Sequence, residues 1–411
     1  MDWRRYSPDT DRDALLRIWH EIGWFQRDVP AHGDAVAAMT ASGNAWCALI
    51  NGTPECIVTT APGTLNYLGE AIPISGVSSV CTSHIGRKQN FARDLSAIAI
   101  ALDAANGALV SALTMFEQGF YNRLGYGNGP YEHRLSFDPA RLNVSSHVPT
   151  PRRIGLDELD KIHRARMNRH TGHGALSFHQ PGMTLSPAGR CPNGFGLGYN
   201  GEDGEISHMI WLGADSMTFG PYVVHFMTWQ TPHQLMELLG LIKQFGDQVR
   251  LVTMMEPAGI QLQDFLLRPI QQLRTTHGSG FEARIDALSL YQYRICDLQG
   301  CLARTHLHCT PFRLNLKLTD PIDACLDFDQ AWRGIAGDYV ITIGPECSAH
   351  RGEDPALLQI ECGVGAFTRL WLGARAASSL YLTDALAGHD EAIERLDLAF
   401  RLPTPQPDWD F

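Results

Sequence analysis

The sequence predicts an α/β protein built from three units. Its 411 residues exceed the length of one ordinary domain, and 44% of them are hydrophobic while 19% are charged, which is enough apolar sequence to bury sizeable cores. Helix-like and strand-like apolar patterns alternate along the chain, and a segment with two prolines at residues 145–153 separates the first two units. We place the units at residues 1–150, 151–290 and 291–411.

The first unit contains a hairpin signal between two amphipathic helices. Asn51-Gly52 separates two apolar runs, and this dipeptide is typical of the tight turn between antiparallel strands. Apolar residues before and after these runs recur at helical spacing. The predicted elements are helices at 11–24 and 91–102 and strands at 47–53, 55–60, 71–82 and 109–113.

The second and third units continue the alternation of strands and helices. Thr231-Pro232 precedes the helix predicted at 235–245, and proline suits the first helical turn. A stretch rich in glycine and proline at 172–204 is expected to be a loop, and the three prolines of 401–411 exclude a helix or a central strand there. The other predicted elements are helices at 156–168, 367–372 and 378–386 and strands at 206–212, 222–227, 249–254, 312–318, 337–343 and 357–362.

The net charge and the apolar content indicate which kinds of molecule the protein could bind. Lysine and arginine number 33 against 44 aspartates and glutamates, a net charge of −11, which disfavours nucleic acid and anionic lipid but suits a cationic substrate. No apolar run approaches the roughly 20 residues that cross a bilayer. The first residues are charged and aromatic rather than the apolar stretch of a secretion signal. We expect a cytoplasmic protein with neither a nucleic-acid nor a membrane partner.

The ten cysteines are expected to be reduced, packed thiols, because most have no near partner in the sequence. Two groups carry zinc-ligand residue types, namely Cys296, Cys301, His306, His308 and Cys309, and His170, His173 and His179. The first has too long a step between its cysteines for a compact zinc module, and the second lies in the glycine-rich stretch. We expect no metal site.

A basic turn between a strand and a helix is the first functional signal. Arg87 and Lys88 lie just before the helix that begins near Phe91. The start of a helix gathers unpaired N–H groups and the positive end of the dipole, an arrangement that binds phosphate oxygens. Many strand-to-helix turns carry basic residues without binding a ligand, so the turn indicates a phosphate site without establishing one.

A second segment, about 30 residues later, joins the first in a family pattern. The pattern consists of Val80-x-Thr82, Arg87-x-x-Asn90-x-Ala92 and Phe120-Tyr121-x-x-x-Gly125-Tyr126. These motifs resemble those of the Gcn5-related N-acetyltransferase (GNAT) family, in which the first two hold acyl-CoA and the third closes the site. The layout of the whole chain, with the segments 291–297 and 367–373, resembles the enhanced intracellular survival (Eis) acetyltransferases.

The resemblance implies a fold, a reaction and an assembly. The expected fold is two tandem GNAT folds, the second without a CoA site, followed by a sterol-carrier-protein-like domain that returns the C-terminus to the first unit. Acetyl-CoA is the implied co-substrate. The implied acceptor is a primary amine of a cationic small molecule, aminoglycoside-like or a polyamine, or of a lysine. A homo-oligomer, a hexamer in this family, is also implied.

The resemblance also implies roles for individual residues. Tyr121 matches the general acid that protonates the leaving thiolate, whereas Tyr126 is expected to pack. The main-chain carboxylate of Phe411 matches the general base that deprotonates the amine, and partial burial would bring its pKa toward neutrality. The implied CoA contacts are Val80, Thr82, Arg87, Lys88, Asn90, Phe91 and Ala92. Asp28, Glu117 and Asp410 are candidates to hold a cationic acceptor, although each could be an ordinary surface or capping carboxylate.

Asn90 departs from the family pattern, which has glycine there. Glycine reaches a positive φ and leaves room for phosphate, and asparagine is the next most tolerant residue for such a backbone. Three functions therefore stay open: an acetyl-CoA-dependent N-acetyltransferase, an enzyme of the same fold with a different acyl donor or chemistry, and a non-catalytic binding protein. The amine substrate, its acetylated position and the pathway are not determined by the sequence.

Overall fold

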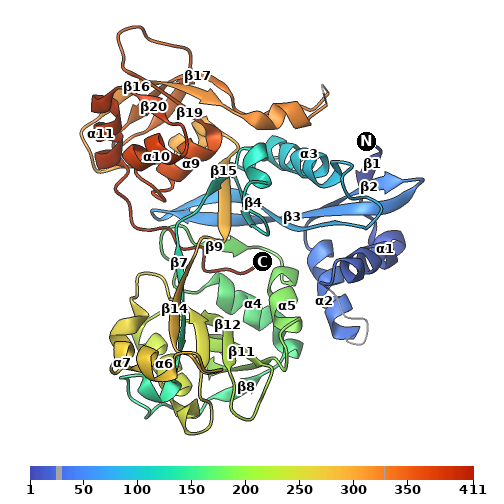
Figure 1. Ribbon diagram of the computed structural model, residues 1–411, viewed down its shortest axis with the longest axis vertical. Helices are drawn as coiled ribbons and strands as arrows, with labels where there is room; N and C mark the ends of the chain where they lie inside the picture. The colour runs from blue at the N-terminus through green and yellow to red at the C-terminus, as the bar shows by residue number, and fades with distance from the viewer. Residues whose placement is uncertain (25–29, 328) are drawn as a thin grey trace.

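The computed structural model describes residues 1–24, 30–327 and 329–411. In this part of the chain the strands form an eight-stranded, a seven-stranded and a five-stranded sheet. The first and third sheets lie together in one half of an elongated molecule, and the second sheet occupies the other half (Figure 1). Within the described ranges, no helix combines the length and apolar character needed to span a bilayer.

The first sheet has the strand order β1-β2-β3-β4-β5-β15-β6, with β9 paired to β3. Its strands are β1 (Trp3–Arg5), β2 (Asn44–Ile50), β3 (Thr53–Tyr67), β4 (Glu70–Thr82), β5 (Val110–Thr114), β6 (Gly127–Asn128), β9 (Leu176–Phe178) and β15 (Tyr291–Ile295). Helix α3 (Phe91–Ala105) covers one face, and α1 (Pro8–Glu21) and α2 (Pro30–Ala41) lie on the other (Figure 1). A short 3-10 helix, η1 (Tyr121–Leu124), follows β5.

The second sheet has the order β14-β7-β13-β12-β11-β10-β8. Its strands are β7 (Glu132–Phe137), β8 (Arg152–Ile154), β10 (Phe195–Asn200), β11 (Ile206–Ala214), β12 (Tyr222–Thr228), β13 (Val252–Met255) and β14 (Arg284–Leu288). The accompanying helices are α4 (Leu159–Met167), α5 (Gly182–Gly189), α6 (Pro232–Gln244) and α7 (Pro269–Thr276), with 3-10 turns η2 (Pro139–Arg141), η3 (Leu156–Glu158), η4 (Phe245–Asp247) and η5 (Leu262–Phe265).

The third sheet has the order β18-β17-β16-β19-β20. Its strands are β16 (Phe312–Thr319), β17 (Gly337–Ile343), β18 (Ser348–Arg351), β19 (Gln359–Gly363) and β20 (Ala387–Gly388). Its helices are α8 (Leu298–Leu302), α9 (Val364–Trp371), α10 (Ala377–Thr383), α11 (Asp390–Ala399) and the 3-10 helix η6 (Pro321–Cys325). This sheet shares a core with the first one: the rings of Tyr67 and Trp371 stack 4.2 Å apart, and the Tyr67 hydroxyl donates to the Trp371 carbonyl at 2.8 Å.

Local sequence signals are confirmed where they are strong. Asn51 and Gly52 both have positive φ, at 50° and 79°, and join β2 to β3 in an antiparallel hairpin. Helix α6 begins at Pro232 with a capping box in which Thr231 Oγ1 accepts from the N–H of Gln234. The C-terminal tail, residues 401–411, is neither helix nor strand, as its prolines predict.

The prediction of a loop at 172–204 is wrong, because this stretch contains β9, α5 and β10. Gly174 and Gly204 have positive φ and lie in turns, but other glycines of this stretch serve close packing. A side chain at Gly182 would collide with Ser42 of the segment after α2, and one at Gly196 would lie 2.9 Å from the ring of Trp211 on the neighbouring strand. Composition alone does not distinguish a glycine in a turn from a glycine in a tight contact.

Strands are exchanged between the units expected from chain order. Strand β7 lies within residues 1–150 but pairs with β13 and β14 of the second sheet. Strand β9 lies within 151–290 but pairs with β3 of the first sheet, and β15 inserts between β5 and β6. Chain order therefore does not assign each strand to its sheet, because long-range pairing decides this.

Candidate active site

The first sheet opens between β4 and β5. These parallel strands pair from Ile74 with Val110 to Val77 with Leu113, and the pairing ends there. On the other side of β4, Ser78 pairs with Thr59 and Cys81 with Ile57, so Ser79 and Val80 form a bulge, and Ser79 has a φ of 51°. A bulge re-aims the strand, which leaves the β5-facing edge of residues 78–82 without a strand partner in the described chain.

A cavity of about 540 Å³ lies at this opening. Its wall brings together five of the predicted site residues, Val80, Ala92, Glu117, Tyr121 and Phe411. They come from β4, α3, the segment before η1, η1 itself and the last position of the chain. Both proposed proton-transfer groups, on Tyr121 and Phe411, therefore belong to residues that line one cavity.

The loop from β4 to α3 combines exposed basic side chains with an uncapped helix start. Arg87 and Lys88 are exposed, and Lys88 and Asn90 both have a φ of 63°. Asn90 thus adopts the left-handed backbone expected of the residue that replaces glycine. No side chain caps α3 at Asn90, so the N–H groups of its first turn are open to a ligand. The amide of His84 donates to Glu21 Oε2 at 2.9 Å, which ties the loop to α1. These features fit a pyrophosphate group.

Tyr121 is buried, with 8% of its surface exposed. Burial raises the pKa of the Tyr121 hydroxyl well above its ordinary value of 10, so the group holds its proton at neutral pH. Its ring packs edge-on against Phe120 and Tyr126, with centroids 4.8 and 6.0 Å away. Tyr126 is also buried, and its hydroxyl lies 2.6 Å from Ser111 Oγ. Such an internal hydrogen bond is typical of a tyrosine that packs in a core.

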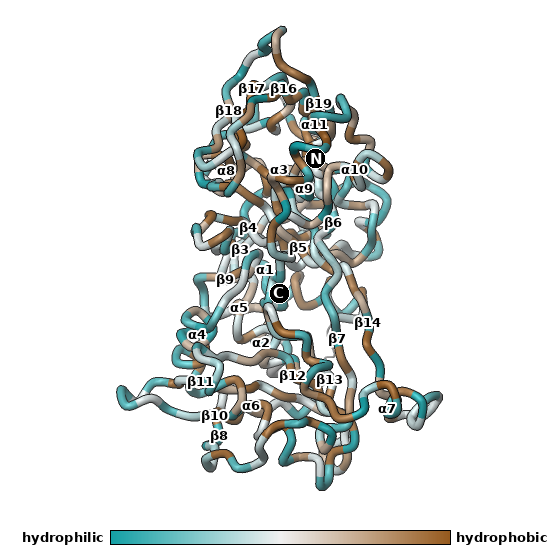
Figure 2. Tube along the Cα trace, turned by 90° about the vertical axis from the view of Figure 1, so that its left-hand side faces the viewer, coloured by the Kyte–Doolittle hydropathy of each residue, from teal (hydrophilic) through white to brown (hydrophobic). Residues whose placement is uncertain are grey.

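The C-terminal tail runs to mid-length of the molecule, between its two halves (Figures 1 and 2). Backbone bonds of 2.8 and 2.9 Å join Pro407 to Leu176 and Gln406 to His173, and Arg169 pairs with Asp408 at 2.7 Å. Trp409 is buried, with the Arg166 guanidinium 3.8 Å from its ring centroid. These contacts hold the tail in place.

The last residue is seated against the first sheet. The ring of Phe411 lies 4.5 Å from that of Phe178 and 6.2 Å from that of Tyr291. A side chain at Gly76 on β4 would collide with Phe178 and approach the Phe411 ring to 3.1 Å. Glycine at this position of β4 therefore makes room for the end of the chain.

Other predicted residues lie elsewhere. Asp410 lines a second cavity of about 260 Å³, together with Glu132 and Arg166, rather than the cavity at Tyr121. Asp28 falls in residues 25–29, outside the described part of the chain. All ten cysteines are free among the described residues, and Cys296 and Cys301 are buried at the junction of β15 and α8.

The structure adds residues that the motifs do not indicate. Trp19 of α1 and Arg190, which follows α5, line the cavity with Tyr121 and Phe411. The Arg190 guanidinium lies 5.5 Å from the Trp19 ring centroid, and its Nε donates to the Ser186 carbonyl at 3.3 Å. Trp19 carries only the signal of an apolar helix face, and Arg190 lies in the stretch expected to be a loop, so neither has a sequence signature of a site.

Comparisons with known proteins agree with this architecture. Residues 4–129 match the acetyltransferase (GNAT) domain, and residues 326–407 match the sterol carrier protein domain. Comparison with curated proteins gives no significant match.

Solved structures share the fold over the whole chain. A probable N-acyltransferase from Enterococcus faecalis V583 is 16% identical with a TM-score of 0.77, covering 99% of this chain and 98% of that one. A GCN5-related N-acetyltransferase from Anabaena variabilis is 13% identical, with complete coverage of both chains and a TM-score of 0.77. Eis1 from Mycobacterium abscessus is 14% identical, also with complete coverage and a TM-score of 0.73. The expected order of two GNAT folds and a sterol-carrier domain is confirmed: the chain contains an acetyltransferase (GNAT) domain at 4–129 and a sterol carrier protein domain at 326–407, and it shares its overall fold with Eis1.

Proposed function

We propose that the protein is an N-acetyltransferase that transfers an acetyl group from acetyl-CoA to a primary amine. The observation that carries this proposal is that Tyr121, Phe411 and the bulge at Val80 line one cavity at the opening of the first sheet. A proton acceptor activates the amine, a proton donor protonates the leaving thiolate, and the N–H groups of a free strand edge can bind the donor and stabilise the developing oxyanion.

Acetyl-CoA suits the cleft from β4 to α3. The free edge of Val80 and Thr82 would pair with the extended pantetheine arm as an added strand does. The amides near Asn90, Phe91 and Ala92, with Arg87 and Lys88, would hold the pyrophosphate. When bound, acetyl-CoA supplies an activated acyl group as a thioester.

The residues of this chain move the protons. The carboxylate of Phe411 accepts a proton from the ammonium group of the acceptor, directly or through water, and leaves a nucleophilic amine. The N–H of Val80 stabilises the negative charge that develops on the acyl oxygen. Tyr121 donates its proton to the leaving thiolate, and because burial raises the pKa of its hydroxyl, the group carries that proton at neutral pH.

The acceptor is a cationic small molecule, aminoglycoside-like or a polyamine, or a lysine side chain. Glu117 and the terminal carboxylate supply negative charge near the cavity, and the net charge of −11 attracts cations at longer range. We place the reaction in the cytoplasm and expect a homo-oligomer. Asp410, which lines the second cavity, stays a candidate for acceptor binding, as does Asp28, which falls outside the described residues.

A panel of amines tests the proposal in one assay. Thiol release from acetyl-CoA is measured with polyamines, aminoglycosides and lysine peptides, and calorimetry measures acetyl-CoA binding in parallel. Turnover with at least one amine supports the proposal. Binding without turnover on any amine, but with turnover from a longer acyl-CoA, would favour a different donor. No binding of any acyl-CoA would favour a non-catalytic binding protein.

A further inference from the structure

We propose that the buried Arg294–Asp320 ion pair is a positioning device, through which the C-terminal domain holds the turn that carries Tyr121. This inference rests on the proposed function, in which Tyr121 is the proton donor. Arg294 and Asp320 do not line the cavity around Tyr121, so we assign them no direct part in the chemistry.

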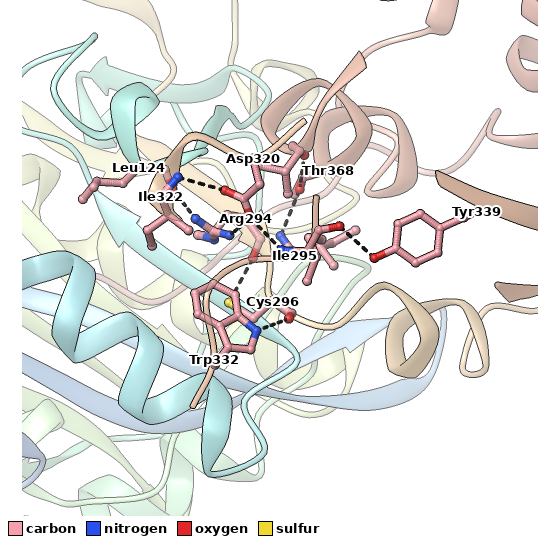
Figure 3. Close-up of polar contacts among 11 residues, drawn as sticks. Leu124, Arg294, Ile295, Cys296, Asp320, Ile322, Trp332, Tyr339 and Thr368 are labelled. Carbon is pink, nitrogen blue, oxygen red and sulfur yellow. Dashed lines mark hydrogen bonds and ion pairs between the residues drawn. The ribbon is translucent and has the colours of Figure 1, made fainter. Parts of the chain in front are cut away.

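The ion pair connects the first sheet, the C-terminal domain and the 3-10 helix η1 (Figure 3). Arg294 lies on β15 in the first sheet, and Asp320 precedes η6 in the C-terminal domain. Arg294 Nη2 lies 2.6 Å from Asp320 Oδ2, and both side chains are fully buried. Arg294 Nη1 donates to the carbonyl of Leu124, the last residue of η1. One guanidinium thus connects Asp320 to the 3-10 helix that begins with Tyr121.

The carboxylate end of the pair is anchored within the C-terminal domain. Asp320 Oδ1 accepts from the N–H of Ile322 at 3.2 Å, and Oδ2 accepts from the N–H of Ile335 at 3.0 Å. Trp332 covers the guanidinium, with its ring centroid 5.1 Å from Arg294 Cζ, and donates its indole N–H to the carbonyl of Cys296 (Figure 3). This enclosure keeps water from the pair and leaves the Leu124 carbonyl dependent on Arg294.

The turn also has internal support, because the Asn122 side chain accepts from the N–H of Gly119 and donates to the carbonyl of Tyr126, each at 2.9 Å. The Tyr121 ring packs against Phe120 and Tyr126, so this packing and the backbone of η1 together set the position of its hydroxyl. Gly125 ends η1 with a φ of 83°, and a side chain there would meet Val364 Cγ1 at 2.6 Å and Arg294 Nη1 at 3.0 Å. The C-terminal domain therefore packs directly on the residue that ends the turn.

Removing one partner of a buried ion pair leaves the charge of the other partner uncompensated. Asp320→Asn keeps the size of the side chain and removes the charge that aligns Arg294. A misplacement of the donor by a fraction of an ångström affects the rate far more than the binding of acetyl-CoA. The pair is thus expected to act on kcat through Tyr121.

The test is a double-mutant cycle on the full chain. Asp320→Asn should lower kcat roughly tenfold or more while the KM for acetyl-CoA stays unchanged. In the Tyr121→Phe background the same substitution should cause almost no further loss, because the donor is already gone. Hydrogen exchange of residues 119–126 should increase in Asp320→Asn at a temperature where the protein is folded. Arg294→Lys, which keeps the charge but loses one arm of the fork, should lie between wild type and Asp320→Asn.

A matched control separates positioning from stability. Thr305→Val removes two buried hydrogen bonds of 2.9 Å in the same domain, one from the Trp371 indole to Thr305 Oγ1 and one from Thr305 Oγ1 to the Cys301 carbonyl. Neither bond involves η1, so the variant should lower Tm without lowering kcat. If Asp320→Asn does not fold, the same double-mutant cycle with Tyr121→Phe is measured with Arg294→Lys or with Gly125→Ala. Losses of kcat that add to that of Tyr121→Phe, or a loss of Tm with unchanged kcat, would overturn the inference and leave the acetyltransferase proposal intact. A Tyr121→Phe variant with normal turnover would instead refute the proton-donor role on which the inference depends.

Discussion

Tyr121 combines a hydroxyl with an environment that keeps it protonated. We expect Tyr121→Phe to lower kcat by about 100-fold or more, the usual contribution of a general acid, because the thiolate then leaves without a proton. Acetyl-CoA affinity should change little, since the ring is retained. Thiol release and calorimetry measure the two quantities, and Tyr126→Phe, which removes a hydroxyl from a buried tyrosine that does not line this cavity, is the control. Unchanged turnover would mean that another group donates the proton.

Glu132 is a second residue whose environment sets its behaviour. It lines the 260 Å³ cavity, its Oε2 has no hydrogen-bond partner among the described residues, and burial with Asp408 and Asp410 nearby raises its pKa from 4.5 to about 8. Between these values the folded protein holds a proton that the unfolded chain has released. The contribution of Glu132 to stability is therefore present below pH 4.5 and is lost as the pH rises toward 8.

Glu132→Gln removes this titration. Compared with wild type, the variant should gain stability as the pH rises from 5 to 8, by at most about 1.4 kcal/mol per pH unit. Urea unfolding at several pH values measures the difference. Glu202→Gln, at an exposed loop glutamate, is the control for general charge effects. A difference between wild type and Glu132→Gln that stays constant with pH would contradict the prediction.

At the scale of elements, the β4–α3 loop depends on its left-handed backbone at Asn90. Glycine adopts this conformation freely, asparagine tolerates it, and alanine is strained there by about 1 kcal/mol. Acetyl-CoA should therefore bind most tightly to Asn90→Gly, less tightly to wild type and least tightly to Asn90→Ala, because glycine also leaves space for phosphate. Calorimetry on the three proteins measures the order, and urea unfolding shows whether stability changes in parallel. Tightest binding by the alanine variant would exclude this account of the loop.

At the scale of the whole molecule, the tail links all three parts of the chain. It is bonded to the second unit through Arg169 and Leu176, contacts β15 through the bond of the Tyr291 hydroxyl to the Trp409 carbonyl at 2.9 Å, and ends against β4. A few residues added after Phe411 convert its carboxylate into an amide and should abolish turnover without unfolding the protein. The same residues added before Met1 are the control. Full activity of the C-terminally extended protein would remove the carboxylate from the mechanism.

The sequence by itself determined the features that depend on near neighbours in the chain. The Asn51-Gly52 hairpin, the start of α6 at Thr231-Pro232 and the irregular tail follow from local backbone preferences, which are the same in any tertiary context. Motifs that resemble a family predict Val80 and Tyr121 as site residues, and the layout of the whole chain predicts Phe411. The structure brings the three residues to one cavity.

Only the tertiary structure decided the contacts made across long separations. Helix α5 and strand β10 lie within a glycine-rich stretch, where neighbouring elements approach Gly182 and Gly196 without room for a side chain. Arg190 enters the cavity wall, and Arg294 meets Asp320 beneath the Tyr121 turn, because strand exchange and domain packing bring these segments together. A single residue in a sequence carries no record of a distant partner, since burial and pairing are properties of the packed chain.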